Sequence, residues 1–278
     1  MEKTLSYKAY IESPYRSTKH STYFEVYDKL LLEYVGKEIV FVEIGILSGG
    51  SLFMWREFFG PKARIIGVDL NPAAKKWEDH GFEIYIGSQS DENFWVNFTR
   101  QVGPIDVVLD DGGHTYEQQI ITTEMLLPMV RDHGILIVED THTSYMRGFG
   151  SRRYSFIEYA KKMIDRCNQR FSGSGVSTPD RRVWSIQCFE SVTAFHVNRE
   201  ATKLLSSPTD NLGINDNAVD FRVYRPRTPG RYPRILKRLK ILKYFPGARH
   251  LSKLLYALDW SDALGSRSTK KYFKLGDK

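Results

Sequence analysis

Apolar residues in the first two thirds of the chain form short continuous runs, and segments with a helical spacing of apolar positions lie between these runs. The runs occupy residues 39–43, 63–69, 82–86, 105–110 and 134–139. The helical segments occupy residues 22–34, 52–59, 72–80, 91–102 and 115–130. Short continuous runs are typical of strands buried on both faces of a parallel sheet. The alternation therefore predicts an α/β fold with a doubly wound, mostly parallel sheet and helices on both faces.

Two further apolar runs follow the alternation, at residues 183–189 and 192–197. Because only two residues separate them, they predict an antiparallel hairpin at one edge of the sheet. At the start of the first predicted helix, Thr22 and Glu25 have the spacing of a capping box. Residues 141–182 interrupt the alternation, and we expect them to form an active-site insertion, because long connections at the carboxyl side of a sheet often carry function.

The composition is that of an ordinary globular protein in water, with 41% hydrophobic and 26% charged residues. The first residues lack an apolar signal region, and no stretch approaches the roughly 18 apolar residues of a membrane span. Only two cysteines are present, Cys167 and Cys188, and we interpret them as reduced thiols. These features predict a cytoplasmic location.

The net charge of +7 hides a strong asymmetry along the chain. Residues 1–221 hold 24 Lys and Arg against 30 Asp and Glu, whereas residues 222–278 hold 16 against 3. Residues 222–255 contain no acidic residue, and within them residues 234–245 interleave cationic and apolar positions. This pattern favours either an amphipathic helix in peripheral contact with an anionic inner membrane surface or a helix packed on the acidic body. Charge alone, without a reader motif, predicts no nucleic-acid binding.

These patterns divide the chain into three parts. We expect residues 1–35 to form an N-terminal helical lid or substrate segment and residues 36–204 to form the catalytic domain, including the insertion. Residues 205–278 are predicted to be a linker and a basic helical tail. Association into a homo-oligomer is compatible with this organisation.

Candidate chemistry lies at the carboxyl ends of the predicted strands, where open parallel sheets bind their ligands. The first strand ends at Glu43 and is followed by Gly45, Gly49 and Ser51 in a glycine-rich turn. Glycines let the backbone approach a ligand, and a helix start offers free N–H groups. Asp69 ends the second strand, where an acid suits the two hydroxyls of a ribose. Together they predict a nucleoside-containing cofactor.

NAD is the competing cofactor, but the strict spacing of its glycine motif is absent, since Leu47 stands where the second glycine belongs. At the end of the third strand, Gln89 and Asp91 have two equally good interpretations. They flank the adenine of a cofactor, or Asp91 (or its neighbour Ser90) caps the next helix.

The fourth and fifth strands end in the segments DDGGH (110–114) and EDTH (139–142). Several carboxylates in one crevice repel each other and need a cation or protons. Carboxylate oxygens favour Mg²⁺ or another hard divalent cation over zinc. The alternative interpretation is capping and ion pairing at two helix starts.

At these residues the chain resembles the macrocin/mycinamicin-type sugar O-methyltransferases, a family that includes cephalosporin-hydroxylase-like and rhamnosyl O-methyltransferase proteins. The resemblance covers about residues 15–200 and is carried by four segments. They are EIG…GGSL…WR (43–56), GVDLNP (67–72), DDGGH (110–114) and EDTHTSY (139–145). Gly113 departs from the family, in which Ser is frequent at this place. The tail from about residue 205 has no counterpart in the resemblance.

The resemblance implies a class I fold and a role for each site residue. S-adenosylmethionine would be bound by Glu43, Gly45, Gly49, Ser51, Asp69, Gln89, Asp91 and Asp110. The divalent metal ligands would be Asp111, Glu139 and Asp140, and His114 would be the general base beside Asp111. A sugar hydroxyl on a small molecule, a glycan or a glycolipid would be the acceptor, as in natural-product or polysaccharide biosynthesis.

Two further histidines lie close to these segments. His142 is interpreted as an outer ligand, a substrate contact or a structural residue, and His20 as an exposed residue or as part of a lid over the acceptor. Competing functions are a non-catalytic partner subunit that binds S-adenosylmethionine and a hydroxylase-like enzyme on the same scaffold. The hydroxylase would require an iron site.

Overall fold

The protein is described from a computed structural model that covers residues 3–171, 180–204 and 206–214. The chain divides into two units, Met1–Pro208 and Thr209–Lys278, and the first unit carries the whole sheet. The basic segment 222–255 lies outside the described residues, so the membrane contact expected of it stays a prediction. In the described part of the chain, no helix is both long enough and apolar enough to cross a bilayer.

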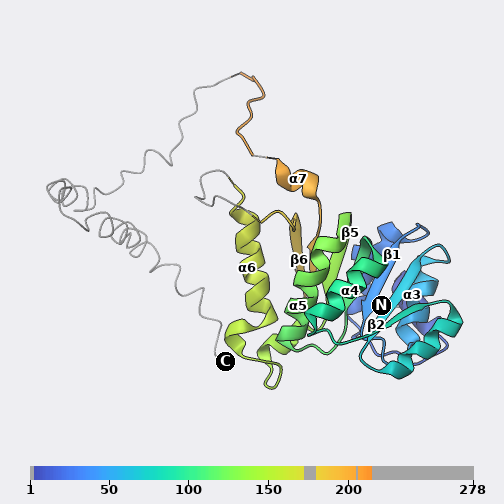
Figure 1. Ribbon diagram of the computed structural model, residues 1–278. Helices are drawn as coiled ribbons and strands as arrows, with labels where there is room; N and C mark the ends of the chain where they lie inside the picture. The colour runs from blue at the N-terminus through green and yellow to red at the C-terminus, as the bar shows by residue number, and fades with distance from the viewer. Residues whose placement is uncertain (1–2, 172–179, 205, 215–278) are drawn as a thin grey trace. The chain divides into compact units, whose positions relative to one another are not determined.

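Seven strands form one sheet in the order β3-β2-β1-β4-β5-β7-β6 (Figure 1). Their bounds are β1 Val40–Ile44, β2 Arg64–Asp69, β3 Glu83–Ile86, β4 Ile105–Asp110, β5 Val130–Val138, β6 Ser185–Phe189 and β7 Val192–His196. The pairs among β1 to β5 are parallel. Strand β7 pairs antiparallel with both β5 and β6. The prediction of a mostly parallel, doubly wound sheet with an antiparallel edge hairpin is confirmed.

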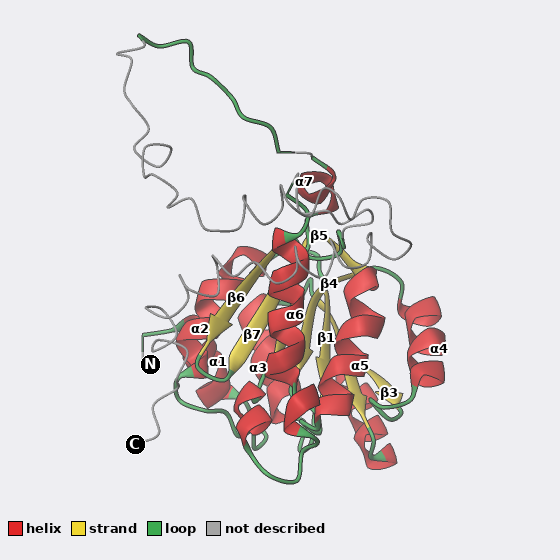
Figure 2. Cartoon of the chain, turned by 90° about the vertical axis from the view of Figure 1, so that its left-hand side faces the viewer, coloured by secondary structure: helices red, strands yellow, loops and turns green. Residues whose placement is uncertain are grey.

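Helices cover both faces of the sheet (Figure 2). The α-helices are α1 Leu5–Glu12, α2 Tyr23–Leu31, α3 Gly50–Phe59, α4 Glu92–Val102, α5 Tyr116–Leu126, α6 Phe156–Asn168 and α7 Arg199–Lys203. The 3₁₀ helices are η1 Leu32–Tyr34, η2 Pro72–His80, η3 Leu127–Met129, η4 Thr141–Tyr145 and η5 Arg152–Tyr154. Apolar side chains of α1, α2 and α3 build one core cluster, and those of α4, α5 and α6 build the other.

The strands supply both clusters because successive side chains point to opposite faces. On β1, Phe41 belongs to the cluster under α1 to α3, whereas Val42 and Ile44 belong to the cluster under α4 to α6. All three are fully or nearly fully buried. Burial on both faces is the reason that the strands read as continuous apolar runs in the sequence.

One sequence prediction about local structure is wrong. Thr22 precedes α2, but its backbone is already helical, with φ −75 and ψ −17, and its side chain makes no capping hydrogen bond. A capping side chain needs an extended backbone at its own position to reach the N–H groups of the first turn. Thr115 has that extended backbone, and the capping box forms there with Gln118 at the start of α5.

The segment 13–20, which we call the strap, joins α1 to α2 and lies against the start of α3. Ser13 Oγ donates a hydrogen bond of 2.8 Å to the carbonyl of Gly50. The backbone approach is so close that a Cβ added to Gly50 would lie 2.3 Å from the carbonyl oxygen of Tyr15. The hydroxyl of Tyr10 donates to the carbonyl of Ser17 at 3.1 Å. These contacts hold the strap beside the carboxyl ends of the strands.

We predict that Arg182→Met weakens the fold at neutral pH only. Arg182 donates to Glu124 on α5 and, at 2.9 Å, to Asp180. Burial opposes the shift, but hydrogen bonds from Arg182 lower the pKa values of both carboxyls. A depressed pKa stabilises the fold above the unfolded pKa, and that stabilisation is lost as the pH falls through the folded pKa.

The variant should therefore lose about 1 kcal/mol at pH 7, a value that allows for partial exposure of these groups. The difference from the unchanged protein should shrink as the pH falls below about 4. Chemical unfolding at a series of pH values measures it. A difference independent of pH would mean that Arg182 acts through packing of its side chain rather than through charge.

Candidate functional site

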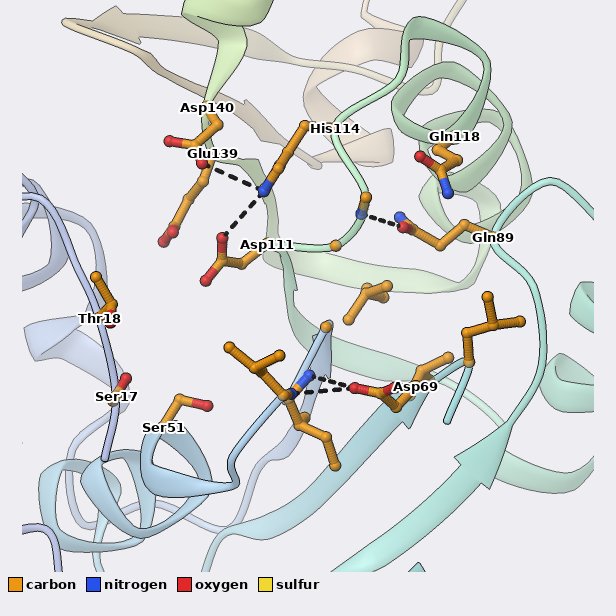
Figure 3. Close-up of a pocket in the computed structure, with 18 of the residues that line it drawn as sticks. Ser17, Thr18, Ser51, Asp69, Gln89, Asp111, His114, Gln118, Glu139 and Asp140 are labelled. Atoms are coloured by element: carbon orange, nitrogen blue, oxygen red, sulfur yellow. Dashed lines mark hydrogen bonds and ion pairs between the residues drawn. The ribbon is translucent and has the colours of Figure 1, made fainter. Parts of the chain in front are cut away.

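A cavity of about 730 Å³ opens at the carboxyl ends of β1, β2, β4 and β5. Its two ends differ in chemistry (Figure 3). At one end lie Ser51, Asp69 and the turn that follows β1, and at the other lie Asp111, His114 and the two acidic residues after β5. The volume is in the range of small-molecule and cofactor sites.

The turn after β1 is shaped by its contact with the segment after β4. Gly45 has φ +83, and a Cβ at this place would lie 2.3 Å from the carbonyl oxygen of Asp111. Asp69 accepts hydrogen bonds from the N–H groups of Ile46 and Leu47 at 3.1 and 3.0 Å. Its other oxygen accepts from the N–H of Asn71 at 2.8 Å. The predicted ribose-binding carboxylate therefore also fixes the turn, and it lines the cavity.

Sequence reasoning did not assign two leucines at this end of the cavity. Leu47 and Leu70 line the cavity, and 84% and 70% of their surfaces are exposed. Leu47 also has a positive φ of 40°, which is strained for a residue with a side chain. Large exposed apolar side chains beside a polar cavity are suited to cover a flat aromatic ring.

The structure divides the predicted cofactor residues into two groups. The members that line the cavity are Gly45, Ser51, Asp69 and Gln89. The members outside its lining are Glu43, Gly49, Asp91 and Asp110. Asp91 caps α4 by accepting from the N–H of Asn93, as one of the two interpretations expected.

Glu43 and Asp110 are buried and hold other residues in place. Glu43 accepts from Ser51 Oγ at 2.7 Å and from Trp55 Nε1 at 3.1 Å. Asp110 accepts from Gln89 Nε2 at 2.7 Å, and the Oε1 atom of Gln89 in turn accepts from the N–H of Gly113. Burial raises the pKa of each of these carboxyls to about 7. They act on the cavity through Ser51 and Gln89.

The acidic end of the cavity contains a lysine that the sequence did not single out. Lys19 comes from the strap, and its side chain is only 1% exposed. Its Nζ lies 2.7 Å from Asp111 Oδ2, 3.2 Å from Glu139 Oε2 and 3.7 Å from Glu43 Oε1. Burial opposes protonation, but Asp111 and Glu139 hold the pKa of Lys19 well above its ordinary value.

One ammonium thus faces three carboxyl groups in a buried region. Burial raises the pKa of Glu139 to about 8, and Glu139 also accepts a hydrogen bond from the hydroxyl of Tyr27. Since the negative groups outnumber Lys19, the region has room for a proton or for a second cation. The hydrogen bonds of Lys19 to Asp111 and Glu139 and of Tyr27 to Glu139 span 92 to 120 residues of sequence, and no local pattern signals them.

His114 and Asp140 meet on the other side of Asp111. His114 Nε2 lies 3.3 Å from Asp140 Oδ2 and 3.8 Å from Asp111 Oδ1, and these three ligand atoms are all within 4.8 Å of one another. Glu139 is not part of this group, because its carboxyl group is engaged by Lys19 and Tyr27. The structure therefore gathers the predicted base with two of the three predicted metal ligands.

Asp140, His114 and Ser191 share an uncommon backbone conformation, with φ of 54°, 58° and 62°. The hydroxyl of Tyr23 donates to Asp140 Oδ1 at 2.5 Å and to Ser191 Oγ at 2.9 Å. Positive φ at residues with side chains costs about 1–3 kcal/mol each and clusters at functional sites. Tyr23 and Ser191 were not among the residues expected from the sequence.

Comparison with known proteins identifies methyltransferases that resemble this chain. Residues 42–141 match the family model of a methyltransferase domain. Demethylmacrocin O-methyltransferase of Streptomyces fradiae is 34% identical over 131 residues, 45% of this chain and 33% of that protein. A tetracenomycin-C rhamnosyl 3'-O-methyltransferase of Streptomyces olivaceus is 41% identical over 103 residues, 37% of this chain and 26% of that protein. The chain thus spans about a third or less of the length of these relatives.

Among solved structures, the MycE methyltransferase of the mycinamycin pathway, in complex with Mg and SAH, matches with a TM-score of 0.62 and 25% identity. The match covers 70% of this chain and 54% of MycE. The Rossmann-like methyltransferase fold and the resemblance to macrocin/mycinamicin-type proteins are confirmed.

We predict that Lys19→Met destabilises the protein when no divalent cation is present. The change leaves buried carboxyl groups without their ammonium partner, which typically costs about 3–5 kcal/mol. The free energy of unfolding, measured with denaturant in a chelating buffer, should fall by this amount. Lys161→Met is the matched control, since its ion pair with Glu158 is exposed. Equal losses in the two variants would show that Lys19 does not balance the buried charge.

Proposed function

We propose that this chain, which carries a methyltransferase domain and is related to sugar O-methyltransferases, transfers a methyl group from S-adenosylmethionine to a sugar hydroxyl. The observation that carries the proposal is the single cavity that joins the Gly45–Asp69 end to the Asp111–His114–Asp140 end. A donor bound at the first end and an acceptor hydroxyl at the second would meet inside the same cavity. The relatives' names supply the acceptor class, a sugar on a glycosylated compound.

The donor end suits an adenosine group. Asp69 lies at the end of β2, where its free lone pairs can accept from ribose hydroxyls. Leu47 and Leu70 present exposed apolar surface on the rim of the cavity. We propose that these two leucines pack against the adenine ring. Ser51, which is oriented by its hydrogen bond to Glu43, would contact the amino-acid part of the cofactor.

The acceptor end supplies a base. A sugar hydroxyl has a pKa of roughly 16, near that of water, so it needs help to lose its proton. His114 Nε2 is the atom that would take this proton, because it lies in the cavity between Asp140 and Asp111. The two carboxylates would stabilise the imidazolium that results. The acceptor oxygen would attack the methyl carbon as the methyl–sulfur bond breaks and S-adenosylhomocysteine leaves, and His114 would then release the proton to solvent.

The residues of this end also fit a hard divalent cation. Asp111 and Asp140 would hold it through carboxylate oxygens and leave Nε2 of His114 for the proton, and the carboxyl groups of this region outnumber Lys19. Glu139, the third ligand implied by the family resemblance, lines the cavity but is engaged by Lys19 and Tyr27, and it would join this set only where Lys19 withdraws. When bound, Mg²⁺ would act as a Lewis acid that acidifies the acceptor hydroxyl.

The competing functions fit less well. An NAD site would require a close backbone approach at Leu47, which carries a side chain there. A partner subunit without turnover would not need His114 beside two carboxylates. A peripheral membrane contact and the choice of small-molecule, glycan or glycolipid acceptor remain predictions from the sequence.

Calorimetric titration should show saturable binding of S-adenosylmethionine and none of NAD. Asp69→Asn should weaken binding of S-adenosylmethionine about 10- to 100-fold, the usual effect of losing hydrogen bonds to a charged group. Asp79→Asn is the control, since Asp79 is an exposed carboxylate of η2 that does not line the cavity. Wild-type affinity in Asp69→Asn would remove the ribose from this end of the cavity.

His114→Ala should lower turnover about 10²- to 10⁴-fold, the usual contribution of a general base. Binding of S-adenosylmethionine should be unchanged, because His114 lies at the opposite end of the cavity. Chelation with EDTA should stop methylation of a glycoside acceptor, and added Mg²⁺ should restore it. Turnover that survives both the substitution and the chelator would contradict the proposed roles of His114 and the cation.

A further inference from the structure

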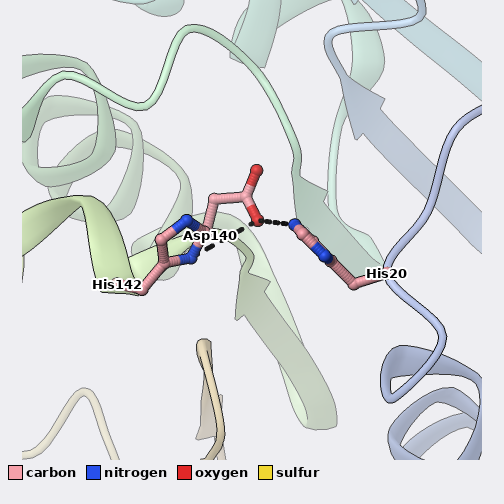
Figure 4. A group of neighbouring side chains, drawn as sticks. All are labelled: His20, Asp140 and His142. Atoms are coloured by element: carbon pink, nitrogen blue, oxygen red, sulfur yellow. Dashed lines mark ion pairs between the residues drawn. The ribbon is translucent and has the colours of Figure 1, made fainter.

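A second group of metal-ligand side chains lies beside the proposed methyl-transfer site and shares Asp140 with it. His20 comes from the strap, Asp140 follows β5, and His142 lies in η4 (Figure 4). His20 and His142 approach one oxygen of Asp140 from two sides, with their rings 5.8 Å apart and nearly perpendicular. The three residues come from segments about 120 positions apart in the sequence.

The distances are those of separated ligands rather than of hydrogen bonds. His20 Nε2 and His142 Nδ1 lie 3.7 and 3.8 Å from Asp140 Oδ1, beyond hydrogen-bond length. The three ligand atoms lie within 4.8 Å of one another. Ligands bound at 2.0–2.2 Å around a tetrahedral ion are about 3.4 Å apart. The two histidine–Asp140 distances exceed this spacing by roughly 0.3 to 0.4 Å, so a small contraction about Asp140 Oδ1, together with closer approach of the two imidazoles, would place all three on one ion.

The surroundings leave this group open to an ion. The side chain of His20 is 64% exposed and that of His142 is 36% exposed, so an ion can enter from solvent. His142 Nδ1 now shares a hydrogen bond with Ser191 Oγ, and Tyr23 donates to Asp140 Oδ1. An ion would replace Ser191 as the partner of His142, while Tyr23 would keep orienting the carboxylate.

The donor chemistry differs from that of the carboxylate end. Two imidazole nitrogens and one carboxylate oxygen suit Zn²⁺ and other divalent transition metals, whereas Mg²⁺ prefers oxygen ligands throughout. Asp140 presents its two oxygens to different groups, with Oδ2 facing His114 and Oδ1 facing His20 and His142. The two groups therefore share one carboxylate but use different oxygens of it.

We propose that His20, Asp140 and His142 form a second cation site that takes a divalent transition metal of the zinc type. Three protein ligands leave a fourth position open to water. Because His20 belongs to the strap and His142 to η4, the bound ion ties the strap to the end of β5 across the rim of the cavity. Occupancy of this site would therefore hold the strap, including Lys19, in the position seen in this structure.

Equilibrium dialysis of the full chain against Zn²⁺ tests the proposal, with Mg²⁺ in excess to saturate the carboxylate end and without a histidine tag. The unchanged protein should bind one ion in this assay. His20→Ala and His142→Ala should each raise the dissociation constant at least about 10-fold, the lower range of losses on removal of a metal ligand or its support. His80→Ala is the control, since His80 is an exposed histidine of η2, and should bind as the unchanged protein does.

Two further measurements make the outcome decisive. Co²⁺ bound in place of Zn²⁺ should show the absorption of nitrogen and oxygen ligation, without the thiolate band that Cys167 or Cys188 would produce. Cleavage by trypsin after Arg16, followed by mass spectrometry, should slow when Zn²⁺ is added to the unchanged protein and not when it is added to His142→Ala. The proposal would be overturned if the unchanged protein failed to bind Zn²⁺. It would also be overturned if His20→Ala and His142→Ala, with their folds intact, bound Zn²⁺ as tightly as the unchanged protein does.

Discussion

The buried ammonium of Lys19 lies among carboxyl groups from the ends of three neighbouring strands, and the arrangement of the site depends on this contact. Strands β1, β4 and β5 are parallel neighbours, so Glu43, Asp111 and Glu139 reach the same edge of the sheet. Carboxylates at this depth are costly without a positive partner. The strap supplies that partner, and the position of the strap is therefore coupled to the charge of the site.

The edge of the sheet could be predicted from the sequence, but the contacts across it could not. Continuous apolar runs located the strands, and the residues after each run were therefore known to meet. Lys19 lies 92 residues from Asp111 and 120 from Glu139, and its partners are set by the path of the strap rather than by any local pattern. Helix α1 was missed for a related reason, since its apolar residues pack on α2 and α3 without a strong stripe of their own.

The predicted cofactor residues divide because a strand end presents side chains to both faces. Asp69 and Gln89 face the cavity, whereas Glu43 and Asp110 point into the protein and orient Ser51 and Gln89. The motif therefore contains two layers of residues, and only one of them can touch a ligand directly. A sequence pattern registers both layers in the same way, because both keep the same turn in place.

Asp140 connects the proposed base with the second cation group. Its left-handed backbone turns the carboxylate out of the line of β5, so that one oxygen faces His114 and the other faces His20 and His142. A substitution of Asp140 would therefore disturb the base and the second cation group together. Substitutions of His20 or His142 would disturb only the second group, and this asymmetry allows the two functions to be separated in the same protein.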